Sequence, residues 1–144
     1  MIKIELKWEK HRDFFELWEK HKDQTQLIYV IGETSNVYIG CIGIRDGKGG
    51  LGQRYQWQYV QRSMAIFGKD KTDGQVSFSA IFVKPKKVTG EIIGAAESIV
   101  QNSFVRLQGK DQALFQPVKF KAGFNLVSVG PVGSIPSFMS YVNQ

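Results

Sequence analysis

The sequence predicts an α+β domain in which a small, largely antiparallel three-stranded sheet is flanked by helices, one of them N-terminal. Two observations carry this expectation: apolar residues alternate at period two in several short runs, and they recur at helical spacing in three others. The composition agrees, since 42% hydrophobic and 22% charged residues over 144 positions are typical of one folded domain. The single cysteine, Cys41, has no intrachain disulfide partner, so we expect a reducing compartment.

The first half of the chain predicts a lead-in strand, a helix, a hairpin and a second helix. Residues 2–8 alternate apolar and charged side chains, and residues 9–22 carry an aromatic stripe at helical spacing. The apolar runs at 27–31 and 37–42 flank a cluster of turn formers, which predicts a β-hairpin. Residues 51–67 predict a helix packed on that hairpin, because their apolar positions share one helical stripe.

The second half predicts one more strand and one more helix. Residues 76–83 alternate as a third strand, and Thr89 can cap a helix over residues 90–107. The core face of that helix is expected to comprise Ile92, Ala96, Ile99, Ser103 and Leu107. Beyond residue 109 we expect irregular or short-stranded chain that ends as a surface tail.

No repeat or linker separates two cores, so we expect a single domain over residues 1–144. Within it we distinguish an N-terminal strand and helix extension over residues 1–24, a core over residues 25–127 and a C-terminal tail over residues 128–144.

The charge balance favours a polyanionic partner. Nineteen basic residues against thirteen acidic ones give a net charge of +6, and nucleic acid is the commonest partner of such a surplus. A surface that is basic only for solubility would give the same balance, so charge alone leaves both interpretations open. Since no run approaches 18 apolar residues, we expect a soluble, cytoplasmic protein with no membrane partner.

Two tyrosines mark the predicted hairpin. If Ile31 faces Asn36 across a four-residue loop, Tyr29 lies directly opposite Tyr38 on the same face of the ladder. An odd loop length would place the two phenols on opposite faces. An aromatic pair that only packs and a pair that takes part in chemistry are both consistent with this spacing.

Two charged residues lie at the edges of predicted helical stripes. Arg54 can present its fork of donors to a phosphate, or it can cover apolar surface with its stem. Glu97 lies at the rim of the stripe in the helix over residues 90–107, where a carboxylate needs a metal ion or an ion-pair partner.

These residues together resemble the signature of the GIY-YIG nuclease family. The run Leu-Ile-Tyr that ends at Tyr29 and the run Tyr-Ile-Gly that begins at Tyr38 match its two halves, with Leu27 in place of the first glycine. Arg54, Glu97 and the Gly-Phe-Asn-Leu run around Asn125 follow in the family's order. The resemblance covers residues 27–125 and implies an endonuclease that hydrolyses DNA phosphodiester bonds with a divalent metal ion.

The resemblance also implies a role for each residue. Tyr29 or Tyr38 would activate the attacking water, and Arg54 would neutralise charge on the phosphate. Glu97 would hold the cation, Mg²⁺ or Mn²⁺, and Asn125 would support the site. DNA is the implied partner and RNA is not excluded; a catalytically inactive nucleic-acid-binding protein of the same fold is the alternative function.

Further polar residues are expected to contact the nucleic acid: Arg45, Lys48, Gln58, Arg62, Lys84, Lys86 and Lys87. The glycines at 47, 49 and 52 also fit a dinucleotide-binding fingerprint, but the strand before them belongs to a hairpin and has no crossover.

The N-terminal segment holds two histidines and an aromatic cluster. His11 and His21 lack metal-ligand spacing on the expected helix, so we expect them at the surface. Phe14, Phe15 and Trp18 give this helix more aromatic surface than a small sheet needs. A homodimer interface and a cap on the domain's own core both stay open.

Overall fold

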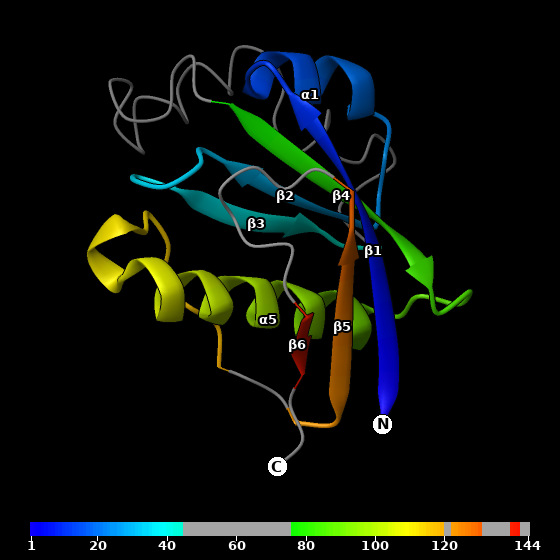
Figure 1. Cartoon of the computed structure of the whole chain (residues 1–144). Helices are drawn as coiled ribbons and strands as arrows, with labels where there is room; N and C mark the ends of the chain where they lie inside the picture. Colours follow the sequence, from blue (N-terminus) through cyan, green and yellow to red (C-terminus); the bar gives the residue numbers. More distant parts are fainter. Residues whose placement is uncertain (45–75, 120–121, 131–138, 142–144) are drawn as a thin grey trace.

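The computed structural model describes residues 1–44, 76–119, 122–130 and 139–141, and they form three layers (Figure 1). A six-stranded sheet with the order β3-β2-β4-β1-β5-β6 lies in the middle. Helix α1 covers one face of the sheet and the long helix α5 packs on the other. The fold class is therefore α+β, as the sequence predicts, but the sheet extends beyond the three predicted strands.

The elements follow one another in a simple order. Strand β1 and helix α1 come first, then the hairpin, and then β4 and α5 with the C-terminal strands. Their bounds are β1 (Ile2–His11), α1 (Phe14–His21), β2 (Leu27–Ile31), β3 (Tyr38–Ile42), β4 (Ser77–Lys84), α5 (Gly90–Gln108), the 3₁₀ turn η1 (Lys110–Gln112), β5 (Phe124–Val129) and β6 (Met139–Tyr141).

Three adjacent strands form the antiparallel unit that the sequence predicts, because β2 pairs with β3 on one side and with β4 on the other. The prediction of a three-stranded sheet is nevertheless wrong, since β1 pairs antiparallel with β4 and parallel with β5, and β5 pairs with β6. The sheet is mixed because of the parallel β1–β5 pair. Of the two expectations for the chain after residue 109, irregular or short-stranded, β5 and β6 bear out the short strands within the described residues.

Strand β1 is not a peripheral lead-in. It lies between β4 and β5 and buries Ile4, Leu6 and Trp8 in the main core, so residues on both sides of the expected boundary at 24 share one sheet. The helix predicted from residue 9 begins only at Phe14, because residues 9–11 continue the strand. Asp13 caps it by accepting a hydrogen bond from the Glu16 amide at 2.9 Å.

The hairpin keeps both tyrosines on one face, although its register differs from the predicted one. Ile31 lies opposite Tyr38 rather than opposite Asn36, so Tyr29 faces Gly40. Two more residues belong to the loop, in which Asn36 adopts a left-handed φ of +53°. Because the loop length stays even, Tyr29 and Tyr38 remain on the same side, with 6.1 Å between ring centroids.

Gly40 is the residue over which Tyr29 packs. The Tyr29 side chain is 1% exposed, and a Cβ at position 40 would lie 2.6 Å from its hydroxyl. We expect Gly40→Ala to lower the free energy of unfolding by about 1–3 kcal/mol, because the buried ring has to move. Denaturant unfolding measures this, with Gly94→Ala as the control, since a Cβ there meets nothing within 4 Å. A Gly40→Ala protein as stable as the wild type would show that the ring adapts without cost.

The apolar side chains of helix α1 pack against the domain's own sheet. Phe14 and Leu17 are buried in one cluster with Tyr29, and Trp18 packs against that cluster. The homodimer was predicted because these aromatic side chains were expected to be exposed. Since Phe14 and Leu17 are buried within the chain, they no longer support a dimer interface, and the homodimer stays an untested prediction.

Helix α5 begins as predicted but turns a different face to the sheet. Thr89 caps it by accepting a hydrogen bond from the Ile92 amide at 3.3 Å. Ile92, Ala96 and Ile99 are buried as expected, whereas Leu107 is 52% exposed and Phe104 is buried. The buried face is thus rotated toward Val100 and Phe104 near the C-terminal half of the helix.

Two predicted segments fall where the chain is not described. The helix expected over residues 51–67 lies wholly outside the described residues, as does most of the expected tail. Within the described part of the chain, no helix is both long and apolar enough to cross a membrane.

Candidate metal centre

The residues expected from the GIY-YIG resemblance are divided between the two faces of the sheet. Tyr29 and Tyr38 lie on the face that α1 covers. Glu97 belongs to α5, which packs on the opposite face over Ile28 and Ile39. The sheet therefore lies between the two tyrosines and the helix that carries Glu97.

Asn125 lies toward another end of the sheet. Asn125 is paired with Lys3 of β1. Tyr29 is paired with Ser79 of β4, and Ser79 is paired with Glu9 of β1, so Tyr29 lies level with Glu9. Lys3 and Glu9 are six positions apart on β1, a distance of about 20 Å along a strand. The described structure does not bring Asn125 to the tyrosines.

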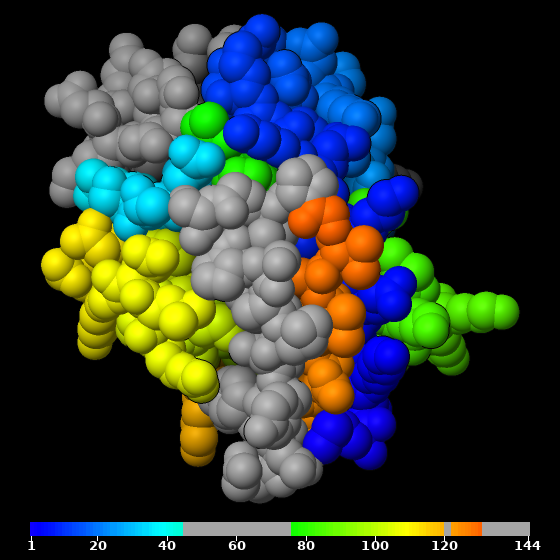
Figure 2. Space-filling view, viewed as in Figure 1, coloured from blue at the N-terminus to red at the C-terminus, as the bar shows by residue number. Residues whose placement is uncertain are grey.

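The predicted nucleic-acid contacts are only partly described. Arg54 and four of the expected contacts lie outside the described residues: Arg45, Lys48, Gln58 and Arg62. Lys84, Lys86 and Lys87 are exposed between the end of β4 and α5. The green segment that contains this turn projects from the surface in Figure 2, a placement compatible with contact to a large ligand.

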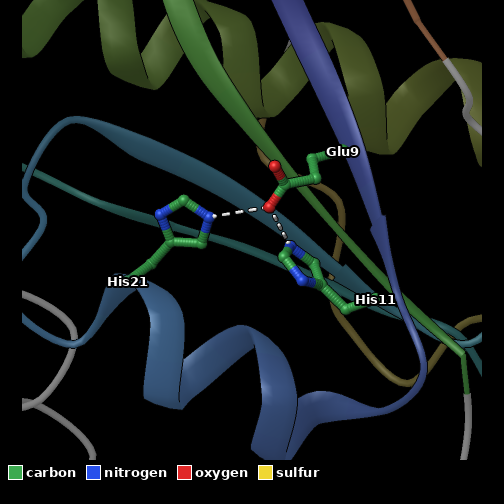
Figure 3. A group of neighbouring side chains, drawn as sticks. All are labelled: Glu9, His11 and His21. Carbon is green, nitrogen blue, oxygen red and sulfur yellow. Dashed lines mark hydrogen bonds and ion pairs between the residues drawn. The ribbon is translucent and has the colours of Figure 1, made fainter.

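A different group of polar side chains meets on the α1 face, as Figure 3 shows. Glu9, His11 and His21 each offer one ligand atom, and these atoms all lie within 4.8 Å of one another. Glu9 and His11 are two residues apart on β1, so both point to the same side of the sheet. Helix α1 folds back over that side and brings His21, at its C-terminal end, to the pair.

One carboxylate oxygen lies between the two imidazoles. Glu9 Oε1 is 3.3 Å from His11 Nε2 and 3.3 Å from His21 Nε2, while Glu9 Oε2 accepts a hydrogen bond from Lys20 Nζ at 2.6 Å. The two imidazole rings meet edge to face, with 5.4 Å between their centroids. One nitrogen of each imidazole thus lies against the same carboxylate oxygen.

Neighbouring polar groups orient the imidazoles. Ser79 Oγ lies 2.8 Å from His11 Nε2, and Gln24 Oε1 lies 3.3 Å from His21 Nδ1. Without a metal ion, His21 Nε2 donates to Glu9 Oε1. A bound ion would take the place of that proton, and the Gln24 carbonyl oxygen would then support His21 by accepting from Nδ1, the usual arrangement for a metal-binding histidine.

The electrostatic surroundings favour ligand forms of these groups. Burial lowers the pKa of His11 below its ordinary value, and the nearby Glu9 charge offsets this only in part. Burial alone would raise the pKa of Glu9, but hydrogen bonds from Lys20 and His21 outweigh it and the pKa is lowered. A neutral imidazole and an ionised carboxylate are the forms that bind a metal ion.

Both pKa shifts predict that acid destabilises the fold. The folded-state pKa of His11 lies below 6.5 and that of Glu9 below 4.5, so the unfolded chain binds more protons than the folded chain in acid. The His11 contribution is present above pH 6.5 and is lost as the pH falls through its lowered pKa; the Glu9 contribution follows below pH 4.5. Unfolding measured from about pH 7.5 to about pH 5 should be less pH-dependent in His11→Gln than in the wild type. Equal slopes would contradict this assignment.

The sequence patterns do not predict this site. His11 was expected on a surface helix, but it lies on β1 and is 2% exposed, so that prediction is wrong. The available signal was the spacing of Glu9 and His11, which places both on one face of a strand. His21 joins them through the packing of α1, which spacing along the sequence does not reveal.

Scans against protein-family models, curated proteins and solved structures found no match to this chain.

Proposed function

We propose that this protein binds a divalent transition-metal ion, zinc above all, through Glu9, His11 and His21. The observation that carries the proposal is the convergence of their three ligand atoms within 4.8 Å. Two imidazoles and one carboxylate are the protein ligands of open hydrolytic zinc sites. Imidazole nitrogens suit zinc and its neighbours better than magnesium, which prefers oxygen ligands.

Three protein ligands leave a coordination position for water. A zinc ion lowers the pKa of bound water to about 7, which supplies a nucleophile at neutral pH. The Glu9 side chain is 42% exposed, so solvent and substrate can reach this edge of the centre. The Lys20 ammonium beside Glu9 is placed to stabilise negative charge that develops during hydrolysis.

Calorimetric titration of the purified chain with zinc tests the proposal. We expect one ion per chain, and an affinity at least about 10-fold weaker in Glu9→Gln, because an amide is a poorer ligand than a carboxylate. Glu5→Gln is the matched control, since Glu5 lies on the same face of β1 and makes the same change in charge. Zinc binding that Glu9→Gln leaves unchanged would refute the assignment.

Hydrolysis of DNA phosphodiester bonds is the reaction we favour for this centre. The antiparallel unit β3-β2-β4 carries the half-buried Tyr38 on the face that also carries Glu9 and His11, whereas Tyr29 on the same face is buried in the core and out of reach of a substrate. Glu9 and Tyr29 are both paired with Ser79, so one strand separates them. The net charge of +6 suits a polyanionic substrate. A catalytically inactive nucleic-acid-binding protein is the alternative.

Cleavage of supercoiled plasmid distinguishes these functions. We expect zinc or manganese to support nicking and a chelator to abolish it, with activity lost in Glu9→Gln and kept in Glu97→Gln. The opposite pattern would assign the metal to Glu97, as the resemblance implies, and would refute catalysis at the Glu9 centre. DNA binding without cleavage under any ion would support the inactive alternative.

A further inference from the structure

We infer that the pocket beside the metal centre binds one nucleotide, with its phosphate at Lys20 and its base between residues 23–26 and β4. The direction of the phosphate rests on the proposed metal centre, whereas the pocket itself does not.

The pocket lies where the C-terminal end of α1 passes over β4. It has a volume of about 560 Å³, within the range of small-molecule sites, and its lining includes Lys20, Gln24, Thr25, Gln26 and Ile81. Most of this lining is polar, and it combines an ammonium, two amides and a hydroxyl with an apolar wall. Such a mixture suits a ligand that has a flat ring with polar edges and one anionic group.

The pocket shares side chains with the metal centre. Lys20 lines the pocket and donates to Glu9 Oε2 at 2.6 Å, and Gln24 lines it while lying 3.3 Å from His21 Nδ1. Ile81 follows Ser79 by two residues on β4, about 7 Å along the same face. A ligand in the pocket therefore reaches the metal ligands across a distance that a sugar can bridge.

Lys20 supplies the anionic end of the pocket. Its ammonium has three donors, and only one bond to Glu9 is needed to hold it beside the centre. A metal ion on Glu9 shares the carboxylate's charge, which leaves the ammonium able to pair with a phosphate oxygen. Asp23, which also lines the pocket, disfavours a second anionic group and so limits the ligand to one phosphate.

The remaining lining suits a nucleobase. The amides of Gln24 and Gln26 each offer donors and an acceptor, and the Thr25 hydroxyl offers both. Ile81, an exposed apolar side chain, gives the ring a surface on which to pack. Gln26 also holds a left-handed φ of +57°, a backbone conformation that residues other than glycine rarely adopt.

A second pocket that Lys20 also lines is a poorer place for a nucleotide. It is smaller, about 320 Å³, and its lining includes Glu16 and Glu19 with Arg12 and Phe15. Arg12 and Lys20 balance these two carboxylates, so charge does not decide between the two pockets. The larger volume and the amides of Gln24 and Gln26 favour the pocket toward β4.

Titration with adenosine monophosphate tests the inference, in the metal-free and in the zinc-loaded chain. We expect binding in both states, at least about 10-fold weaker in Lys20→Met, because a charge-assisted hydrogen bond is lost. Lys22→Met is the matched control: it removes the same charge from a lysine that lies over the Trp18 ring. Adenosine and inorganic phosphate, titrated separately, should each bind more weakly than the nucleotide.

The outcomes separate this inference from the proposed function. Zinc binding without nucleotide binding, or nucleotide binding that Lys20→Met and Lys22→Met weaken equally, would overturn the pocket and leave the metal centre standing. Nucleotide binding that depends on Lys20 in a chain that takes up no zinc would support the pocket and refute the metal centre. Phosphate that binds as tightly as the nucleotide would reduce the site to an anion site and overturn the inference.

Discussion

His21→Ala is expected to weaken zinc binding by more than about 100-fold, since loss of a supporting residue alone costs about 10- to 100-fold and this change removes a ligand. The fold should persist, because His21 lies at the end of α1 and its hydrogen bonds go to Glu9 and Gln24 rather than to the core. Competition with a chromogenic chelator measures the affinity. Lys22→Ala, one residue further along, is the control and should bind zinc like the wild type. Affinity that survives in His21→Ala would place the ion elsewhere.

Phe104→Ala is expected to lower the free energy of unfolding by about 3–5 kcal/mol, because it opens a cavity in the main core. Phe104 is fully buried and lies 6.1 Å from the ring of Phe115. Leu107→Ala on the same helix is the comparison, and it should cost well under half as much since Leu107 is largely exposed. Denaturant unfolding compares the two. A larger loss in Leu107→Ala would mean that the helix turns its originally predicted face to the sheet.

The sequence predicts those elements whose signals are local. The hairpin of β2 and β3 lies where two β-branched runs flank turn residues, and β4 and α5 begin close to their predicted positions. Thr89 was identifiable as a cap because a hydroxyl before a helical stripe satisfies an amide of the first turn. These features depend on residues a few positions apart.

Features that depend on distant residues were not predicted. The parallel pairing of β1 with β5 joins Ile2 to Phe124, and no pattern within either strand specifies that partner. The buried face of α5 depends on what packs against it: Gln101 donates to the Ile39 carbonyl at 3.0 Å and accepts from the Val118 amide at 2.9 Å. Gln101 is buried by these tertiary contacts, although a polar residue is not counted when a buried helix face is predicted from the spacing of apolar residues.

The candidate site shows the same division. Tyr29 and Tyr38 were correctly placed on one face, because an even loop preserves the alternation of strand side chains. Glu97 was placed at the rim of its helix, but the sequence does not reveal which face of the sheet that helix covers. In the metal centre, His21 lies beside His11, ten residues earlier in the chain. This contact depends on the turn capped by Asp13 and on the burial of Leu17, which together hold α1 against the sheet.

Anomalous diffraction at the zinc edge, from crystals of the zinc-loaded chain, tests the central claim most directly. We predict one peak at about 2.0–2.2 Å from a nitrogen of His11, a nitrogen of His21 and a carboxylate oxygen of Glu9. A peak at Glu97, or no peak within bonding distance of these three residues, would contradict the account.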